Sequence, residues 1–310
     1  MIRDLRKPDA PRVLRLLKTQ FPEEEALLGT RPEGFGKVID RVFRWDAQFV
    51  IRLSRWFGRP LFRFFVDEED GGLVATTLLS FAQRSGYVSM VVVDPAYRRR
   101  GLAQALLETA RVATQSAGRK YIALDVLAQN TPARTLYERI GYRPLRESSY
   151  MVREPGAPLA GPPSPSVRPF RRDDARALVE VARRSTPTEV EEVLPLREGS
   201  LRGSNFVNQI LNSKTAAWVV DRGHGAEAYL GAVSTPTTSA GHLSDPIVGE
   251  GMDAADSAAL VRAAVNWCID QRSAQIITQV PTANVRGRAA LQGGGFQDAL
   301  ALWTLYRPVA

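Results

Sequence analysis

Short runs of apolar residues separated by polar turns predict strands in the first half of the chain. Leu61–Val66, Leu73–Gln83 and Tyr87–Asp94 are rich in β-branched and aromatic residues, and the polar stretch DEEDGG separates the first two runs. A fourth run, Tyr121–Ala128, and a last one, Ser148–Arg153, have the same character. We expect a strand at each run.

Apolar positions recur every three or four residues in two later segments, which predicts helices at Gly101–Ala117 and Thr131–Ile140. Hairpin strands would therefore come first, and a β-α-β crossover would follow. This order predicts an α/β (α+β) fold with a mixed, largely antiparallel twisted sheet that is flanked by helices.

A third helical pattern covers Gly36–Phe57, where aromatic and valine residues recur at helical spacing. The pattern favours a helix whose apolar face covers the sheet. A wall of a substrate cleft and a basic-aromatic helix that binds a membrane surface are the alternatives.

The pattern of the first half begins again in the second half. Ile2–Leu17 and Val167–Ala182 each contain a short basic strand, a polar turn and an amphipathic helix. Asn130–Tyr142 and Asn284–Phe296 match in the spacing of asparagine, small residue, glycine and aromatic residue. We interpret the chain as a tandem repeat of one domain type.

The length of 310 residues also favours two domains. The stretch REPGAPLAGPPSPSV between the repeats is rich in proline, glycine, alanine and serine, which is typical of a semi-rigid linker. The expected organisation is a first domain at 1–154, a linker at 155–165 and a second domain at 166–310.

The net charge of +8 suits anionic partners such as phosphates, nucleotide cofactors or nucleic acid, although solvated basic surfaces give the same value. The single Cys268 excludes an internal disulfide framework, and with only His224 and His242 beside it we expect no metal site. The chain shows no signal-peptide pattern and no apolar run of ~18 residues. We therefore expect a cytoplasmic protein without a membrane span.

The stretch DPAYRRRGLAQALLETA joins a valine-rich strand to a helix. Pro95 ends the strand, Gly101 allows a positive φ, and the helix start presents unpaired N–H groups. Such a turn can hold a diphosphate, and arginines add forked donors. A solvated basic helix start is the alternative. Nucleic acid is not expected, because basic and aromatic residues do not interleave and no known DNA or RNA motif occurs.

The pattern Val93-x-Pro95-x-x-Arg98-x-x-Gly101-x-Ala103 resembles the acetyl-CoA signature of the GCN5-related N-acetyltransferases (GNAT). The resemblance implies that main-chain N–H groups of the turn hold the coenzyme diphosphate. It also implies that two central strands splay apart and that the pantetheine arm pairs with the strand before the turn. The cofactor-binding residues that it implies here are Val91, Val92, Val93, Arg98, Arg99, Arg100, Gly101, Leu102 and Ala103.

A second stretch, LDVLAQNTPARTLYERIGY, is similar to a later motif of the same family. The resemblance implies that Tyr137 protonates the leaving coenzyme A thiolate, whereas a tyrosine packed in the core is the alternative. Asn130 would either bond the pantetheine or cap the helix.

The general base is less clear, because many family members carry a glutamate in the strand before the turn and Tyr87–Val91 contains no carboxylate. Asp125 is our candidate, acting through a bridging water, since ribosomal-protein N-terminal acetyltransferases use a glutamate at the matching offset. A surface aspartate paired with an arginine is the alternative. Glu23, Glu24 and Glu25 are further candidates, or part of a solvated face.

The second repeat lacks these features. Leu291 stands where Tyr137 stands in the first repeat, and the loop PIVGEGMDAADSAALV has no arginine but contains Glu250, Asp253 and Asp256. Carboxylates repel a diphosphate. We expect a degenerate copy that packs on the first. The tandem architecture is similar to that of mycothiol synthases, in which the C-terminal copy is catalytic, so their substrate is not transferred.

The resemblance therefore implies an acetyl-CoA-dependent N-acetyltransferase with its active site in the first repeat. Transfer would be direct, in a ternary complex, to a primary amine of an unidentified small molecule or peptide. The alternative is a non-catalytic module that binds coenzyme A or has a regulatory role. Both a monomer and a homodimer fit the sequence.

Overall fold

The computed structural model describes residues 1–18, 43–44, 54, 61–69, 71–154, 156–201, 208, 212–236 and 238–310. The helix expected at Gly36–Phe57 lies outside the described residues except for three positions, and Glu23, Glu24 and Glu25 lie outside them entirely.

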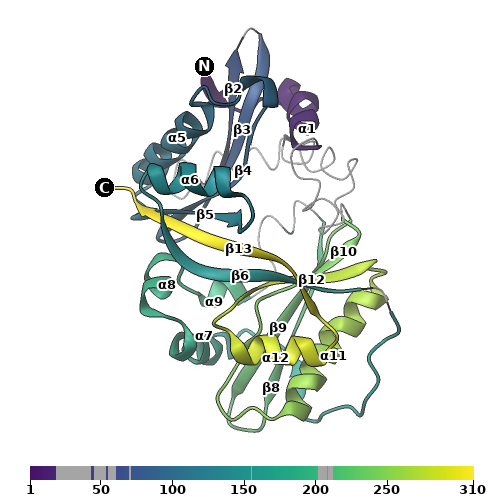
Figure 1. The fold of residues 1–310 in the computed structure, drawn as a ribbon. Helices are drawn as coiled ribbons and strands as arrows, with labels where there is room; N and C mark the ends of the chain where they lie inside the picture. Colours follow the sequence, from purple (N-terminus) through teal and green to yellow (C-terminus); the bar gives the residue numbers. More distant parts are fainter. Residues whose placement is uncertain are drawn as a thin grey trace.

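The described strands join into one mixed sheet of thirteen strands. Figure 1 shows strands of both halves meeting in the middle of the molecule. The first half contributes β1 (Ile2–Asp4), β2 (Phe62–Glu69), β3 (Gly72–Phe81), β4 (Ser85–Val93), β5 (Tyr121–Leu127) and β6 (Arg143–Arg153). The second half contributes β7 (Val167–Pro169), β8 (Lys214–Asp221), β9 (Ala226–Ser234), β10 (Ala240–Leu243), β11 (Ile247–Val248), β12 (Gln275–Pro281) and β13 (Gln297–Pro308).

Helices cover each half of this sheet (Figure 1). Those of the first half are α1 (Ala10–Lys18), α5 (Leu102–Ser116) and α6 (Thr131–Arg139). Those of the second half are α7 (Asp174–Ser185), α8 (Thr188–Val193), α9 (Glu198–Leu201), α11 (Ala254–Asp270) and α12 (Val285–Gly293). None of the helices in these described segments is long and apolar enough to cross a membrane. The elements agree with the expected α/β architecture.

One boundary differs from the sequence expectation. The stretch DEEDGG, expected as a turn, begins inside β2, which continues to Glu69. Asp67 pairs with Ile2 of β1 and with Ala75 of β3, so a strand neighbour on each side extends β2 through polar residues. Arg3 also donates to Glu68 at 2.9 Å, which neutralises one of these carboxylates.

The two halves exchange their last strands. β13 lies between β5 and β6, and β6 lies between β13 and β12. Each half thus receives the final strand of the other half, and Figure 1 shows β6 and β13 running side by side through the middle of the molecule. Side chains of the two halves therefore meet at the centre of the sheet.

The α8 helix strengthens this connection. Val193 packs with Ala123 of β5 and Tyr306 of β13 on the sheet face opposite α5. Tyr121 and Tyr306 donate hydrogen bonds to glutamates of α8, Glu192 and Glu189. Second-half residues thus cover part of the first half, as expected for a copy that packs on its partner.

Candidate active site

The central strands of the first half separate midway along their length. β4 and β5 pair in parallel from Ser85 to Val88, and beyond Val88 no pairing continues, although β4 stays paired with β3 as far as Val93. Met90 has a φ of +53°, and the β3–β4 register shifts there, which is a β-bulge. The bulge turns β4 away from β5, and we refer to the unpaired edge between these two strands as the slot.

Main-chain groups of β4 are aimed at this slot. The Asp94 N–H donates to Val74 of β3 at 2.8 Å, and hydrogen-bonding direction alternates along a strand. The backbone of Val91 and Val93 consequently faces the slot, while Val92 pairs with β3. An extended amide chain lying in the slot could pair with β4 as an additional strand does.

The turn that follows β4 is shaped for an anion. The Asp94 side chain accepts from the Ala96 N–H at 2.9 Å, and a short 3-10 turn at Pro95–Tyr97 leads to Arg99, whose φ is +66°. Gly101 precedes α5 with a φ of +82° and has no side chain to cap the helix. The first N–H groups of α5 consequently lack intrahelical partners, and no atom lies within 4 Å of a Cβ placed on Gly101.

The three arginines lie at the rim of this turn and are exposed. The Arg98 Nε donates to the Val93 carbonyl at 3.4 Å. The Arg100 guanidinium lies 3.6 Å from Glu69 and 4.9 Å from the ring centroid of Tyr97, with 57% of the side chain exposed. Ala103 is half-buried, and the Leu102 side chain is buried in the core. A contribution of Leu102 to ligand binding would therefore come from its main-chain N–H group.

Tyr137 lies in the core cluster that adjoins the slot, together with Leu102 and Val126, and Val91 and Val93 pack against that cluster. Its side chain is only 7% exposed. In the described part of the chain its hydroxyl has no hydrogen-bond partner, and burial raises the pKa of Tyr137 to about 12. The phenol is therefore protonated at neutral pH, which is the state that a general acid needs.

Asn130 caps α6, because its Oδ1 accepts from the Ala133 N–H at 3.2 Å. This is one of the two roles expected from the sequence. The Nδ2 group has no partner among the described residues, so it can still donate to a ligand.

Asp125 sits at the centre of the sheet rather than beside an arginine. Its Oδ1 accepts from Thr304 at 2.6 Å and its Oδ2 from Gln279 at 2.8 Å. Burial, then the charge of Asp125 and a hydrogen bond to it, raise the pKa of Tyr87 well above its ordinary value. The carboxylate thus has partners from both halves, which sequence reasoning missed because two of them are more than 150 residues away.

The second half repeats the geometry of the slot. β10 pairs in parallel with β12 up to Leu243, and β11 then pairs only with β9. Ile247 pairs with Tyr229 as Val92 pairs with Thr76, so Pro246 and Val248 correspond to Val91 and Val93.

Side chains bridge this second slot. Asn284, the equivalent of Asn130, donates from Nδ2 to the Pro246 carbonyl at 2.8 Å and to Asp245 Oδ1 at 2.7 Å. Arg286 approaches the Val248 carbonyl at 3.4 Å. The carbonyls that face the slot in this half are therefore already engaged. In the first half a proline, Pro132, stands at the position of Arg286 and cannot make such a contact.

The start of α11 is also occupied. Asp253 accepts from the Asp256 N–H at 2.7 Å, and Arg222 contacts both carboxylates at 2.9 Å. The protein's own carboxylate takes the place that an anion takes at an uncapped helix start. Leu291, opposite Tyr137 in the repeat, is fully buried.

Three comparisons with known proteins bear on this arrangement. The model of the acetyltransferase (GNAT) family matches residues 16–142. A mycothiol acetyltransferase from Beutenbergia cavernae is 33% identical over 91 residues, which are 29% of this chain and 31% of the relative. The matched segment is thus less than a third of that relative's length.

Solved structures share the whole architecture. A tandem GNAT protein from the clavulanic acid biosynthesis pathway superposes with a TM-score of 0.67 at 14% identity, covering 100% of this chain and 98% of the other. A GCN5-related N-acetyltransferase from Sphaerobacter thermophilus gives a TM-score of 0.63 at 16% identity, covering 100% and 95%. At these identities the likeness concerns the fold.

Proposed function

Because the chain belongs to the acetyltransferase (GNAT) family and has a tandem fold, we propose that its first half transfers an acetyl group from acetyl-CoA to a primary amine. The observation that carries this proposal is the contrast between two equivalent slots. No described β5 residue pairs with Val91–Val93, whereas Asn284 and Arg286 bridge the counterpart of this slot.

The family uses acetyl-CoA as its co-substrate, and the residues of the first half fit it. The N–H groups between Arg98 and Ala103 would hold the diphosphate, since Gly101 leaves the helix start uncovered. The backbone of Val91 and Val93 would pair with the amides of the pantetheine arm. Asn130 would donate to that arm from its remaining N–H groups.

Acetyl transfer needs a neutral amine, a polarised carbonyl and a proton for the departing sulfur. An N–H group of the Val91–Val93 strand would polarise the thioester carbonyl as the amine attacks. Asp125 would receive the proton from nitrogen through a water, and Tyr137 would donate its proton to the thiolate as the C–S bond breaks. The products are an amide and free coenzyme A, without a covalent enzyme intermediate.

The experiment is a measurement of thiol release from acetyl-CoA with a panel of primary amines, including short peptides, followed by mass spectrometry of the product. Thiol release that depends on the amine and a mass increase of one acetyl group are expected. Absence of release with every amine, in a sample that binds coenzyme A, would contradict acetyl transfer.

That last outcome describes the second candidate function, a non-catalytic module that binds coenzyme A. One observation favours it: Asp125 already accepts hydrogen bonds from Thr304 and Gln279, and Tyr87 bonds to it as well. To act as a base, the Asp125 carboxylate also needs a lone pair that is free to accept a hydrogen bond from the bridging water. Replacing Gln279 by leucine would release one oxygen, and a faster rate in Gln279→Leu would identify that hydrogen bond as a restraint on catalysis.

A further inference from the structure

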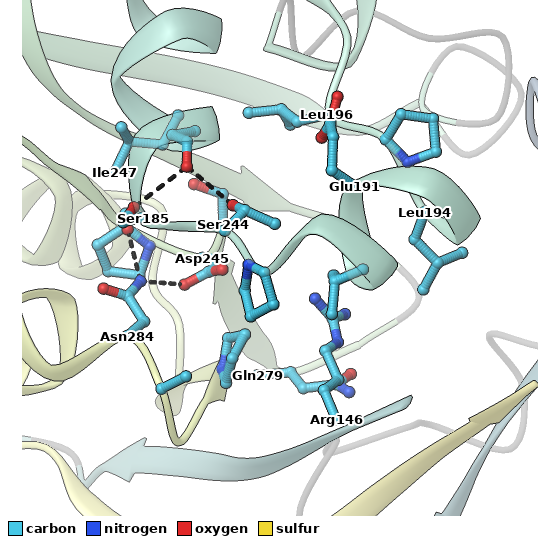
Figure 2. Close-up of a pocket in the computed structure, with 18 of the residues that line it drawn as sticks. Arg146, Ser185, Glu191, Leu194, Leu196, Ser244, Asp245, Ile247, Gln279 and Asn284 are labelled. Atoms are coloured by element: carbon cyan, nitrogen blue, oxygen red, sulfur yellow. Dashed lines mark hydrogen bonds between the residues drawn. The ribbon is translucent and has the colours of Figure 1, made fainter. Parts of the chain in front are cut away.

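The second half contains a cavity to which no step of the proposed acetyl transfer is assigned, although Gln279, which lines it, donates to Asp125. It has a volume of about 490 Å³ and lies between the α8–α9 segment, β6 and the bend from β10 to β11 (Figure 2). Small-molecule sites have volumes of roughly 300–1,000 Å³. The cavity is therefore large enough for a metabolite.

Its lining is mixed in polarity and charge. Apolar walls come from Leu194, Leu196 and Ile247. Figure 2 shows Arg146 extending from β6 toward the cavity, with Asp245 beside Asn284 on another wall. Such an apolar cavity with a few convergent polar groups is typical of a ligand site.

Asp245 offers a negative charge without a direct cationic partner. Its Oδ1 accepts from Asn284 Nδ2 at 2.7 Å, and within the described segments its Oδ2 has no partner. Surrounding protein atoms partly desolvate the carboxyl group, and this raises the pKa of Asp245 to about 6 against the smaller opposing effects of Asn284 and Arg146. Its surface nevertheless opens into the cavity, so it is accessible to a ligand.

Arg146 offers the matching positive charge. The Arg146 Nε donates a hydrogen bond to Thr304 Oγ1 at 3.5 Å, and no described carboxylate forms an ion pair with Arg146. The other acids at the cavity are differently placed, because Glu191 pairs with Arg183 at 3.6 Å and Glu147 is exposed. One guanidinium and one carboxylate oxygen thus face the same cavity, and Arg146 lowers the pKa of Asp245, but the two form no direct ion pair in the described segments.

We propose that this cavity binds a small zwitterion, with the ligand's ammonium group on Asp245 and its carboxylate on Arg146. Guanidinium and carboxylate form forked hydrogen bonds, and a carboxylate attracts an ammonium more strongly where the surrounding protein excludes water. The ligand is held and not acetylated there, because Asn284 and Arg286 close the adjacent slot. The site is therefore a binding site of the otherwise degenerate copy.

Calorimetry on the full chain without acetyl-CoA tests the proposal. The probes are an ω-amino acid series, namely glycine, β-alanine, 4-aminobutyrate and 6-aminohexanoate, with propylamine and propionate as single-group controls. At least one zwitterion should bind with one site per chain and about tenfold or more tighter than either control. No binding at millimolar concentration, or equal binding of the single-group compounds, would overturn the proposal.

Two variants locate the site. Asp245→Asn and Arg146→Gln should each lower the affinity for the tightest-binding zwitterion by about tenfold or more, because each removes one charged contact. Glu147→Gln removes a charge at the exposed rim and should leave the affinity within about twofold. Arg146→Gln keeps the Asp245–Asn284 contact, so it remains informative if Asp245→Asn disturbs folding. Unchanged affinity in Arg146→Gln would place the ligand elsewhere.

The result is independent of the acetyl-transfer proposal. Arg100→Glu alters only the diphosphate turn of the first half and should bind the zwitterion as the wild type does. Loss of zwitterion binding in Arg100→Glu would assign the ligand to the first half instead. A protein that binds the zwitterion but releases no thiol would retain this inference while losing the proposed activity.

Discussion

Replacement of Tyr137 by phenylalanine separates proton donation from packing. The substitution removes one hydroxyl group and keeps the ring, whose centroid lies 6.0 Å from that of Tyr142. Because the hydroxyl has no partner in the described part of the chain, its loss breaks no hydrogen bond there. We expect the free energy of unfolding to change by less than about 0.5 kcal/mol.

The rate should change far more than the stability. General acid catalysis contributes roughly 10²–10⁴-fold, so kcat should fall by that factor, which corresponds to about 3–5 kcal/mol of transition-state stabilisation. Affinity for coenzyme A should stay close to that of the wild type. Since the pKa of Tyr137 is raised to about 12, the wild-type rate should show no decline from ionisation of this group below about pH 11.

Tyr142 provides a matched control. Its hydroxyl is also buried without a hydrogen-bond partner in the described segments, and burial raises its pKa as well. Tyr142→Phe should retain activity and be as stable as the wild type or more so, because an unpaired buried hydroxyl is costly. Thiol release measures the rate, thermal unfolding the stability and calorimetry the cofactor affinity. Full activity in Tyr137→Phe, or equal losses in both variants, would refute the general-acid assignment.

Four further predictions concern the two halves. Arg100→Glu should weaken the binding of coenzyme A about tenfold or more, as measured by calorimetry, whereas Arg84→Glu, at the opposite end of the first half's sheet, should not. Equal affinities of the two variants would exclude the turn as the diphosphate-binding site. Asp125→Asn should lower kcat/KM about 10²-fold or more with unchanged cofactor affinity, and an unaltered rate would exclude it as the base. Coenzyme A should titrate to one site per chain, because Asp253 caps the second helix start; two sites would show that this slot opens. The pKa of Asp245 exceeds its ordinary value, so the folded state binds more protons than the unfolded state between about pH 4 and 6. The free energy of unfolding should therefore fall as pH rises through that window. Thermal unfolding should show a smaller fall in Asp245→Asn.

The local features of the first half could be predicted from the sequence. Pro95 and Gly101 mark the end of a strand and the start of a helix, and the structure gives Gly101 the positive φ that glycine adopts most easily. Capping was one of the two roles expected for Asn130 from its position before a helix, and the structure shows this cap. These features depend on neighbouring residues and backbone sterics, so a short stretch of sequence contains the information.

Patterns in the sequence also indicated which half could bind the coenzyme. The acids near α11 and the leucine at position 291 pointed to a degenerate copy. The means of closure was not visible, however, because Asn284 repeats an asparagine that leaves its first-half slot open. Only Asp245 and the Pro246 carbonyl, both contributed by another strand region, make Asn284 a bridge.

The sequence by itself determined the strands and the two later helices of the first half and the turn between Val93 and Ala103, since periodicity and turn chemistry act over a few residues. The tertiary structure decided which strands became neighbours. β6 and β13 end equivalent repeats, and either half offers each of them an open edge, so global packing alone selects the exchange. That exchange brings Thr304 and Gln279 to Asp125 and carries Arg146 into the cavity of the other half.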